Sequence, residues 1–74
     1  MKPLYHVEAK WDPEANVWIS KSDIPGLVVE AETLAEFEDL VRALVPEILA
    51  DNEGGDGGGR VELTSSRTFE LADA

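Results

Sequence analysis

The chain has no cysteine and a single histidine, His6. The absence of cysteine excludes disulfide bonds and thiolate metal sites, and it fits a reducing compartment. Nucleophilic and metal catalysis generally need a histidine held beside a serine, a cysteine or a second ligand. The isolated His6 is therefore interpreted as a surface residue, and we expect neither a cofactor, nor a metal, nor enzymatic activity.

Basic residues are scarce as well, because six Lys and Arg stand against sixteen Asp and Glu and give a net charge of −10. The acidity is spread over the whole chain and is not gathered in a tail. Such a surface repels phosphate backbones, so direct nucleic-acid binding is not expected. It attracts basic proteins and speeds their encounter. Solubility alone explains the same charge, and the sequence leaves both explanations open.

Long apolar runs are missing too. No run approaches the ~20 residues of a membrane span, and the first residues lead into a strand pattern without a signal-peptide core. We therefore expect a cytoplasmic protein. A hydrophobic content of 43% in 74 residues predicts one globular domain over residues 1–74. A core of this size usually leaves only ~3–5 kcal/mol of net stability, so a homodimer is expected to supplement it.

Apolar and polar residues alternate in the first part of the chain. The alternation over residues 4–11 and 17–20 predicts a hairpin, with turn residues between them. A Pro-Gly pair then breaks the ladder before a third strand over residues 27–31. A fourth strand is predicted over residues 60–71, where Ser65 and Arg67 interrupt the apolar face. That interruption predicts a bulge, or a strand that leaves the sheet toward a second subunit.

The middle of the chain has a helical period. Thr33 followed by Glu36 is a capping box, which predicts a helix over residues 33–50. Pro46 inside the apolar stripe predicts a kink or a looser last turn. The glycine-rich stretch 51–59 lacks the lysine of a phosphate-binding loop, and it is interpreted as a flexible connection. The residues expected to pack together are Phe37, Leu40, Val41 and Leu44 on the helix with Tyr5 or Val7, Val17 or Ile19, and Leu63 on the sheet.

The element order β-β-β-α-β predicts an α+β fold. It consists of an antiparallel three-strand meander, a fourth strand parallel to the first, and one helix packed on one face. The expected sheet order is 3-2-1-4, which leaves one face and two edges open to pairing. Trp11 and Trp18 face one another, either as a hairpin-stabilising pair or with one of them exposed as an interface anchor. The candidate residues for a partner or dimer interface are Trp11, Trp18, Phe69 and Leu71.

Several segments together are similar to a known bacterial family. The chain resembles the N-terminal domain of HicB-type antitoxins, and more closely a group of short, uncharacterised relatives of that domain. The resemblance covers roughly residues 5–53. The matching residues are Tyr5, the Asp12-to-Trp18 hairpin, the corner Asp23-Ile24-Pro25-Gly26-Leu27, the segment Glu30-Ala31-x-Thr33-x-x-Glu36 and the run Pro46-Glu47-Ile48-Leu49.

The resemblance implies a partial ribonuclease-H-like fold without nuclease activity, usually dimeric. In HicB-type systems this domain binds and masks a small, basic, RNA-cleaving toxin of the HicA kind. HicB proteins usually continue into a DNA-binding module, whereas this chain ends at Ala74. No C-terminal DNA-binding module is therefore expected.

Three functions follow for testing. The first is an antitoxin-like, non-catalytic protein-binding module, and the second is a stand-alone homodimeric structural or regulatory domain with no toxin partner. The third is an active ribonuclease, for which Asp12, Glu14 and Asp23 are the nearest candidate metal ligands. They are expected at opposite ends of a short hairpin, which disfavours a shared metal site.

Overall fold

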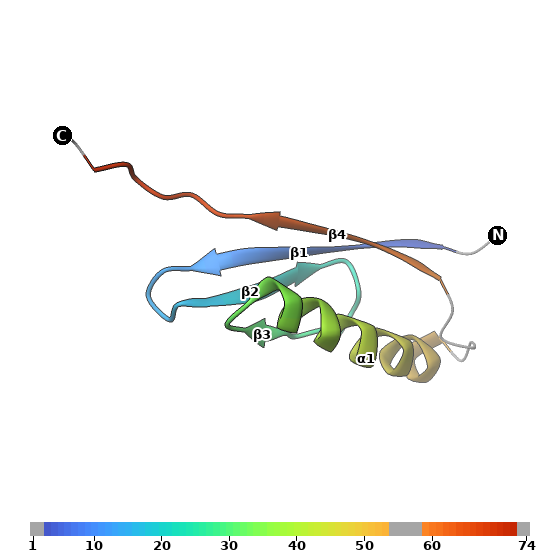
Figure 1. Ribbon diagram of the computed structural model, residues 1–74. Helices are drawn as coiled ribbons and strands as arrows, with labels where there is room; N and C mark the ends of the chain where they lie inside the picture. Colours follow the sequence, from blue (N-terminus) through green and yellow to red (C-terminus); the bar gives the residue numbers. More distant parts are fainter. Residues whose placement is uncertain (1–2, 54–58, 73–74) are drawn as a thin grey trace.

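One mixed sheet and one helix make up the fold. The computed structural model describes residues 3–53 and 59–72, apart from the side chains of residues 52 and 53. Its elements are β1 (Leu4–Asp12), β2 (Val17–Ser22), β3 (Glu30–Ala31), α1 (Leu34–Glu53) and β4 (Arg60–Ser66). The sheet order is β3-β2-β1-β4, with β1 antiparallel to β2 and parallel to β4 (Figure 1). The predicted α+β architecture and sheet order are confirmed.

The first hairpin turns on Asp12 and Asn16. The Asp12 Oδ1 atom accepts a hydrogen bond from the backbone N–H of Glu14 at 3.0 Å, and the Asn16 N–H donates to the Asp12 carbonyl at 2.8 Å. Asn16 has a φ of 57°, a left-handed conformation that asparagine tolerates better than most residues. The turn fixes the register of β1 against β2, and this register places Trp11 directly opposite Trp18.

The third strand is shorter than the sequence predicts, covering Glu30–Ala31 instead of residues 27–31. The Ser20 side chain explains part of the difference. Its Oγ atom accepts the backbone N–H of Val29 at 2.9 Å, while the Ser20 N–H donates to the Val29 carbonyl at 3.0 Å. A side chain thus takes the place of one ladder hydrogen bond, and the regular pairing begins only after Val29.

The helix begins where its cap predicts and runs further than expected. Thr33 Oγ1 accepts the backbone N–H of Glu36 at 3.1 Å, and the Thr33 carbonyl accepts that of Phe37 at 2.9 Å. α1 then continues as an α-helix past Pro46 to Glu53, so the looser last turn expected near residues 42–45 is wrong. Pro46 and Arg42 are both exposed, so water can bond the carbonyl that loses its donor. Most of the predicted glycine-rich connection, residues 54–58, lies outside the described residues.

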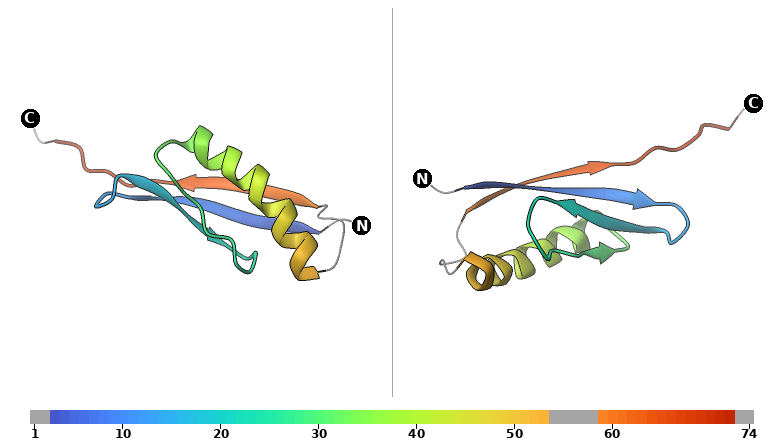
Figure 2. Two further views of the ribbon diagram at one scale, coloured as in Figure 1. Left: turned by 90° about the horizontal axis from the view of Figure 1, so that it is seen from below. Right: turned by 180° about the vertical axis from the view of Figure 1, so that it is seen from behind.

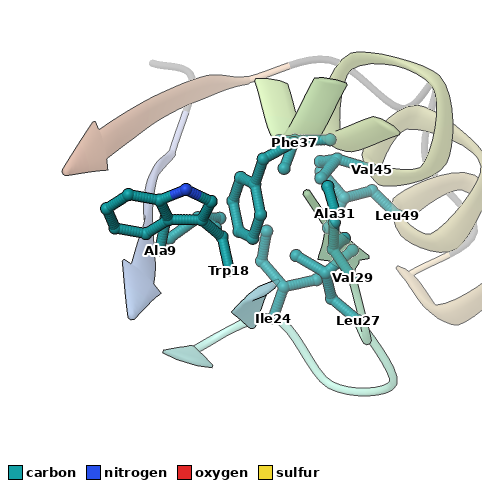
Figure 3. Close-up of a cluster of buried hydrophobic side chains, with 11 residues drawn as sticks. Ala9, Trp18, Ile24, Leu27, Val29, Ala31, Phe37, Val45 and Leu49 are labelled. Atoms are coloured by element: carbon teal, nitrogen blue, oxygen red, sulfur yellow. The ribbon is translucent and has the colours of Figure 1, made fainter. Parts of the chain in front are cut away.

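The core lies between α1 and the face of the sheet that it covers (Figures 2 and 3). Phe37 is 0% exposed and Val7 1%, and Trp18 joins the same cluster. The expectation that Val17 or Ile19 would pack under the helix is wrong, because Ile19 is on the opposite face of β2 and 39% exposed. Side chains alternate along a strand, so pairing Trp18 with Trp11 turns both neighbours of Trp18 outward.

The 20 residues of α1 are numerous enough to raise the question of a membrane span. Among the residues that the structure describes, no helix combines the length and the apolar character needed to cross a lipid bilayer.

Candidate protein-binding surface

β4 is an edge strand whose side chains are hardly covered. It is hydrogen-bonded to β1 on one side, and the sheet has no described strand on its other side. Only Leu63 among its residues is half-buried, and the others are exposed. Val61 shares the helix-side face with Leu63 and is 37% exposed. An open edge with apolar side chains beside it is a template for pairing with another chain.

Residues 67–72 follow β4 without regular structure and lead away from the sheet past the first hairpin (Figures 1 and 2). The predicted strand to Leu71 is therefore too long, since β4 ends at Ser66. β1 turns into the hairpin after Asp12, which in this register would lie opposite residue 68, so β1 offers no partner to the residues beyond it. Phe69 and Leu71 are 69% and 83% exposed. We call residues 67–72 the C-terminal arm.

Arg67 anchors the arm to Trp11, which in turn packs against Trp18. The rings of Trp11 and Trp18 meet edge to face, with centroids 5.3 Å apart and planes at 64°. The Arg67 Cζ atom lies 4.3 Å from the centroid of the Trp11 ring, within the range of a cation–π contact. Trp18 is 8% exposed and belongs to the core, whereas Trp11 is half-buried. The pair thus acts as a hairpin stabiliser, and Trp11 supplies its surface side.

A groove that the sequence analysis missed runs between α1 and β4. Its volume is about 380 Å³, and Tyr5 and Gly59 are the lining residues where β4 begins. Arg42 donates a hydrogen bond to Glu38 at its rim, at 3.1 Å. The apolar lining residues are Val41, Val45 and Leu49 on the helix with Val61 and Leu63 on the strand. The only sequence signal for this groove is that the apolar residues 61, 63, 69 and 71 share one face. This alternation does not show which of them the helix covers.

Asp23 directly follows β2, at the end of the hairpin away from its turn, and we call its contacts with His6 the Asp23 corner. The Asp23 carboxylate accepts the backbone N–H of His6 at 3.0 Å, and its second oxygen lies 3.1 Å from His6 Nδ1. The backbone hydrogen bond from His6, followed by the hydrogen bond with its ring, lowers the pKa of Asp23 from its ordinary value. The Ser22 hydroxyl donates to the His6 carbonyl at 2.7 Å. These contacts end the β1–β2 ladder with both backbone groups of His6 satisfied.

The structure keeps the candidate ribonuclease ligands apart. Asp12 and Glu14 belong to the hairpin turn, while Asp23 follows the far end of β2. Within residues 3–53 and 59–72, no three Asp, Glu, His or Cys side chains are grouped so that they could hold a metal ion.

Comparison with known proteins places the chain in a family without giving an activity. No curated protein matches it. The crystal structure of hypothetical protein TTHA1013 from the extreme thermophile Thermus thermophilus is similar, with 39% identity over 95% of this chain and 99% of that chain and a TM-score of 0.71. Residues 4–69 match the family described as a domain of unknown function, DUF1902, and they include β1 to β4 and the start of the arm. The chain is therefore a member of the DUF1902 family.

Proposed function

We propose that the chain is a cytoplasmic, non-catalytic protein-binding module of the HicB antitoxin type, with a partial ribonuclease-H-like fold. Its partner in this proposal is a small, basic, RNA-cleaving protein of the HicA kind. The observation that carries the proposal is an uncompensated acidic stripe on the outer face of α1. It is supported by the resemblance of residues 5–53 to HicB-type domains.

The stripe consists of Glu36, Asp39 and Glu47, which lie on one side of the helix around the small residue Ala43. All four are exposed. Among described residues the ion pairs are Glu38 with Arg42 and His6 with Asp23, so no basic side chain neutralises the stripe there. Ala43 leaves room for a partner's backbone to come close. A basic surface would gain both encounter rate and orientation from this arrangement.

The first part of the test is whether a small basic protein of the HicA kind is encoded beside this gene, and the second part uses that protein, purified separately. We expect the full chain to bind it, to inhibit its cleavage of RNA, and to lose affinity as salt rises. The variant E36K/D39K/E47K should weaken binding by about tenfold or more, since it reverses three interfacial charges. The control E14K/E30K/E62K makes the same net change at exposed residues away from the stripe, and it should weaken binding much less. Equal losses, or no binding by the wild type, would refute the stripe as the binding site.

The non-catalytic part has its own test. The purified chain should not cleave RNA in the presence of magnesium or manganese. Cleavage that disappears in Asp12→Ala or Asp23→Ala would replace the binding-module proposal with a ribonuclease.

The alternative is a stand-alone homodimeric domain with no toxin partner. The open edge of β4 and the apolar arm favour it, and both lie away from the acidic stripe.

A further inference from the structure

We infer that the groove between α1 and β4 is the binding site for the C-terminal arm of a second copy of this chain. The two arms are exchanged symmetrically, and Ser65 lies on the two-fold axis. This assembly uses the β4 edge and not the outer face of α1, so it stands or falls independently of the basic partner proposed above.

The first step concerns the backbone of β4. In a parallel pair, successive residues direct their N–H and C=O groups to opposite sides of the strand. The Arg60 N–H donates to the Pro3 carbonyl at 3.0 Å, so even-numbered residues of β4 face β1. Val61, Leu63 and Ser65 then direct their backbone groups to the open side. An added antiparallel strand must bond these odd-numbered residues with odd-numbered residues of its own.

The second step concerns the side chains. Val61 and Leu63 lie on the helix side of β4 beside the groove, and both remain partly exposed. Phe69 and Leu71 share their parity, and they are the arm's large apolar residues. In an antiparallel pair, opposite residues project from the same face of the sheet. A second copy's arm beside β4 therefore presents its Phe69 and Leu71 to the groove, which is the apolar surface that the helix leaves uncovered.

The third step is charge complementarity, which selects the register. An axis at Ser66 places Glu62 opposite the partner's Glu70 twice, and an axis at Arg67 places two arginines face to face. Both arrangements oppose like charges, which is unfavourable. An axis at Thr64 leaves Leu71 beyond the groove.

An axis at Ser65 is the remaining arrangement. It places Arg60 opposite the partner's Glu70, twice, and Val61 opposite the partner's Phe69. Arg60 and Glu70 are both exposed, and neither takes part in an ion pair within the described part of the chain. The partner's Leu71 then faces Gly59, beside the Tyr5 ring that lines the groove where β4 begins. In this register the backbone groups at the open edge of β4 are hydrogen-bonded, apolar side chains fill the groove, and opposite charges are paired.

The interface is tested first by mass. Light scattering on the full chain at micromolar concentration should give twice the chain mass. Phe69→Asp should raise the dimer dissociation constant by about a hundredfold, because the substitution occurs twice in each dimer. Val28→Asp is the matched control, since Val28 is 81% exposed and shortly precedes β3, the edge strand at the opposite side of the sheet from β4. It should leave the dissociation constant unchanged.

The register is tested by charge exchange and by a single cysteine. R60E and E70R should each weaken the dimer, and R60E/E70R should restore it. Ser65→Cys should oxidise to a covalent dimer, because the two Cα atoms of such a pair lie about 5.5 Å apart, within disulfide range. Glu14→Cys, in the hairpin turn of this otherwise cysteine-free chain, is the control and should not.

A monomer at every concentration would overturn the inference, and an arm folded back onto its own groove is one form of that result. A dimer that tolerates Phe69→Asp and shows no recovery in R60E/E70R would overturn it as well, because another face would then be in contact.

Discussion

β1 and β4 lie side by side and carry the same alternation, yet they are held in different ways. β1 places Val7 and Ala9 under the helix, where they are 1% and 0% exposed. β4 has no buried residue and is joined to the rest mainly through its backbone hydrogen bonds with β1. Alternation of apolar and polar residues therefore predicts a strand, but it does not predict whether the helix buries the apolar face of that strand. A strand with apolar residues that its own helix leaves uncovered has that surface available for another chain.

The largest expected effect lies under the helix. Phe37→Ala should lower the free energy of unfolding by about 3–5 kcal/mol, because the Phe37 side chain is fully buried and its removal leaves a cavity. A 74-residue chain would then be largely unfolded at 25 °C, and circular dichroism with urea titration would show it. Val28→Ala, at an exposed position, should change stability by no more than about 0.5 kcal/mol. Similar losses for the two would contradict the assignment of the core.

The next largest effect is expected from a substitution at Gly59, directly before β4, and it tests how tightly β4 is held against β1. Gly59 has a φ of +154°, and a Cβ atom there would lie 3.0 Å from Tyr5 Cε2 and 3.3 Å from the Pro3 carbonyl oxygen. Gly59→Ala should cost about 3 kcal/mol, since backbone strain and close contact add. Gly26 has a φ of +85° with no atom within 4 Å of a Cβ, so Gly26→Ala should cost only about 1 kcal/mol. If urea titration gave equal losses of stability for the two variants, backbone conformation alone would determine the cost, and the close contact at Gly59 would contribute nothing.

A smaller effect on stability is expected from the contact that joins the C-terminal arm to the hairpin. The contact between Arg67 and Trp11 should be worth about 0.5–1 kcal/mol, as for other exposed cation–π pairs. The double-mutant cycle of Arg67→Ala and Trp11→Leu isolates it, measured on the dimer-deficient Phe69→Asp background to remove the effect of association. A coupling free energy near zero would show that the arm is not anchored at this ring.

The smallest expected effect is a pH dependence at the Asp23 corner. The His6 N–H lowers the pKa of Asp23 in the folded chain, so its contribution to stability is fully present above about pH 4. It is lost as the pH falls further, through the lowered folded-state pKa. Asp23→Asn should therefore be less stable than the wild type at neutral pH, and this difference should shrink in acid. A difference in urea midpoint that is the same at neutral pH and in strong acid would contradict this role.

Much of the fold could be predicted because local signals agree with one another. Thr33 begins the helix as an N-cap, Asn16 takes the left-handed conformation of its turn, and Trp11 pairs with Trp18. Each of these rests on residues close in sequence or on simple alternation. Val17 and Ile19 were predicted on the wrong face of the sheet. The same alternation, applied to the residues beside Trp18, places both on the face away from the helix.

The candidate surface was predicted only in part. The exposure of Phe69 and Leu71 followed from the excess length of the last apolar pattern. The groove could not be predicted, because it depends on where α1 crosses the sheet relative to Val61 and Leu63. That position is set by packing among distant residues and has no local sequence signal.

The pairing of β1 with β4 also sets the order in which the structure forms and opens. Leu4 pairs with Arg60, so this ladder closes almost the whole described chain into a loop, whereas β1 and β2 meet through a short turn. Closing the long loop is the slower and entropically costlier step. Amide protons in β4 should accordingly exchange with solvent before those of the β1–β2 ladder. Symmetric association through Ser65 would reverse this order, because it moves the least persistent strand from the margin of one sheet to the middle of a larger one.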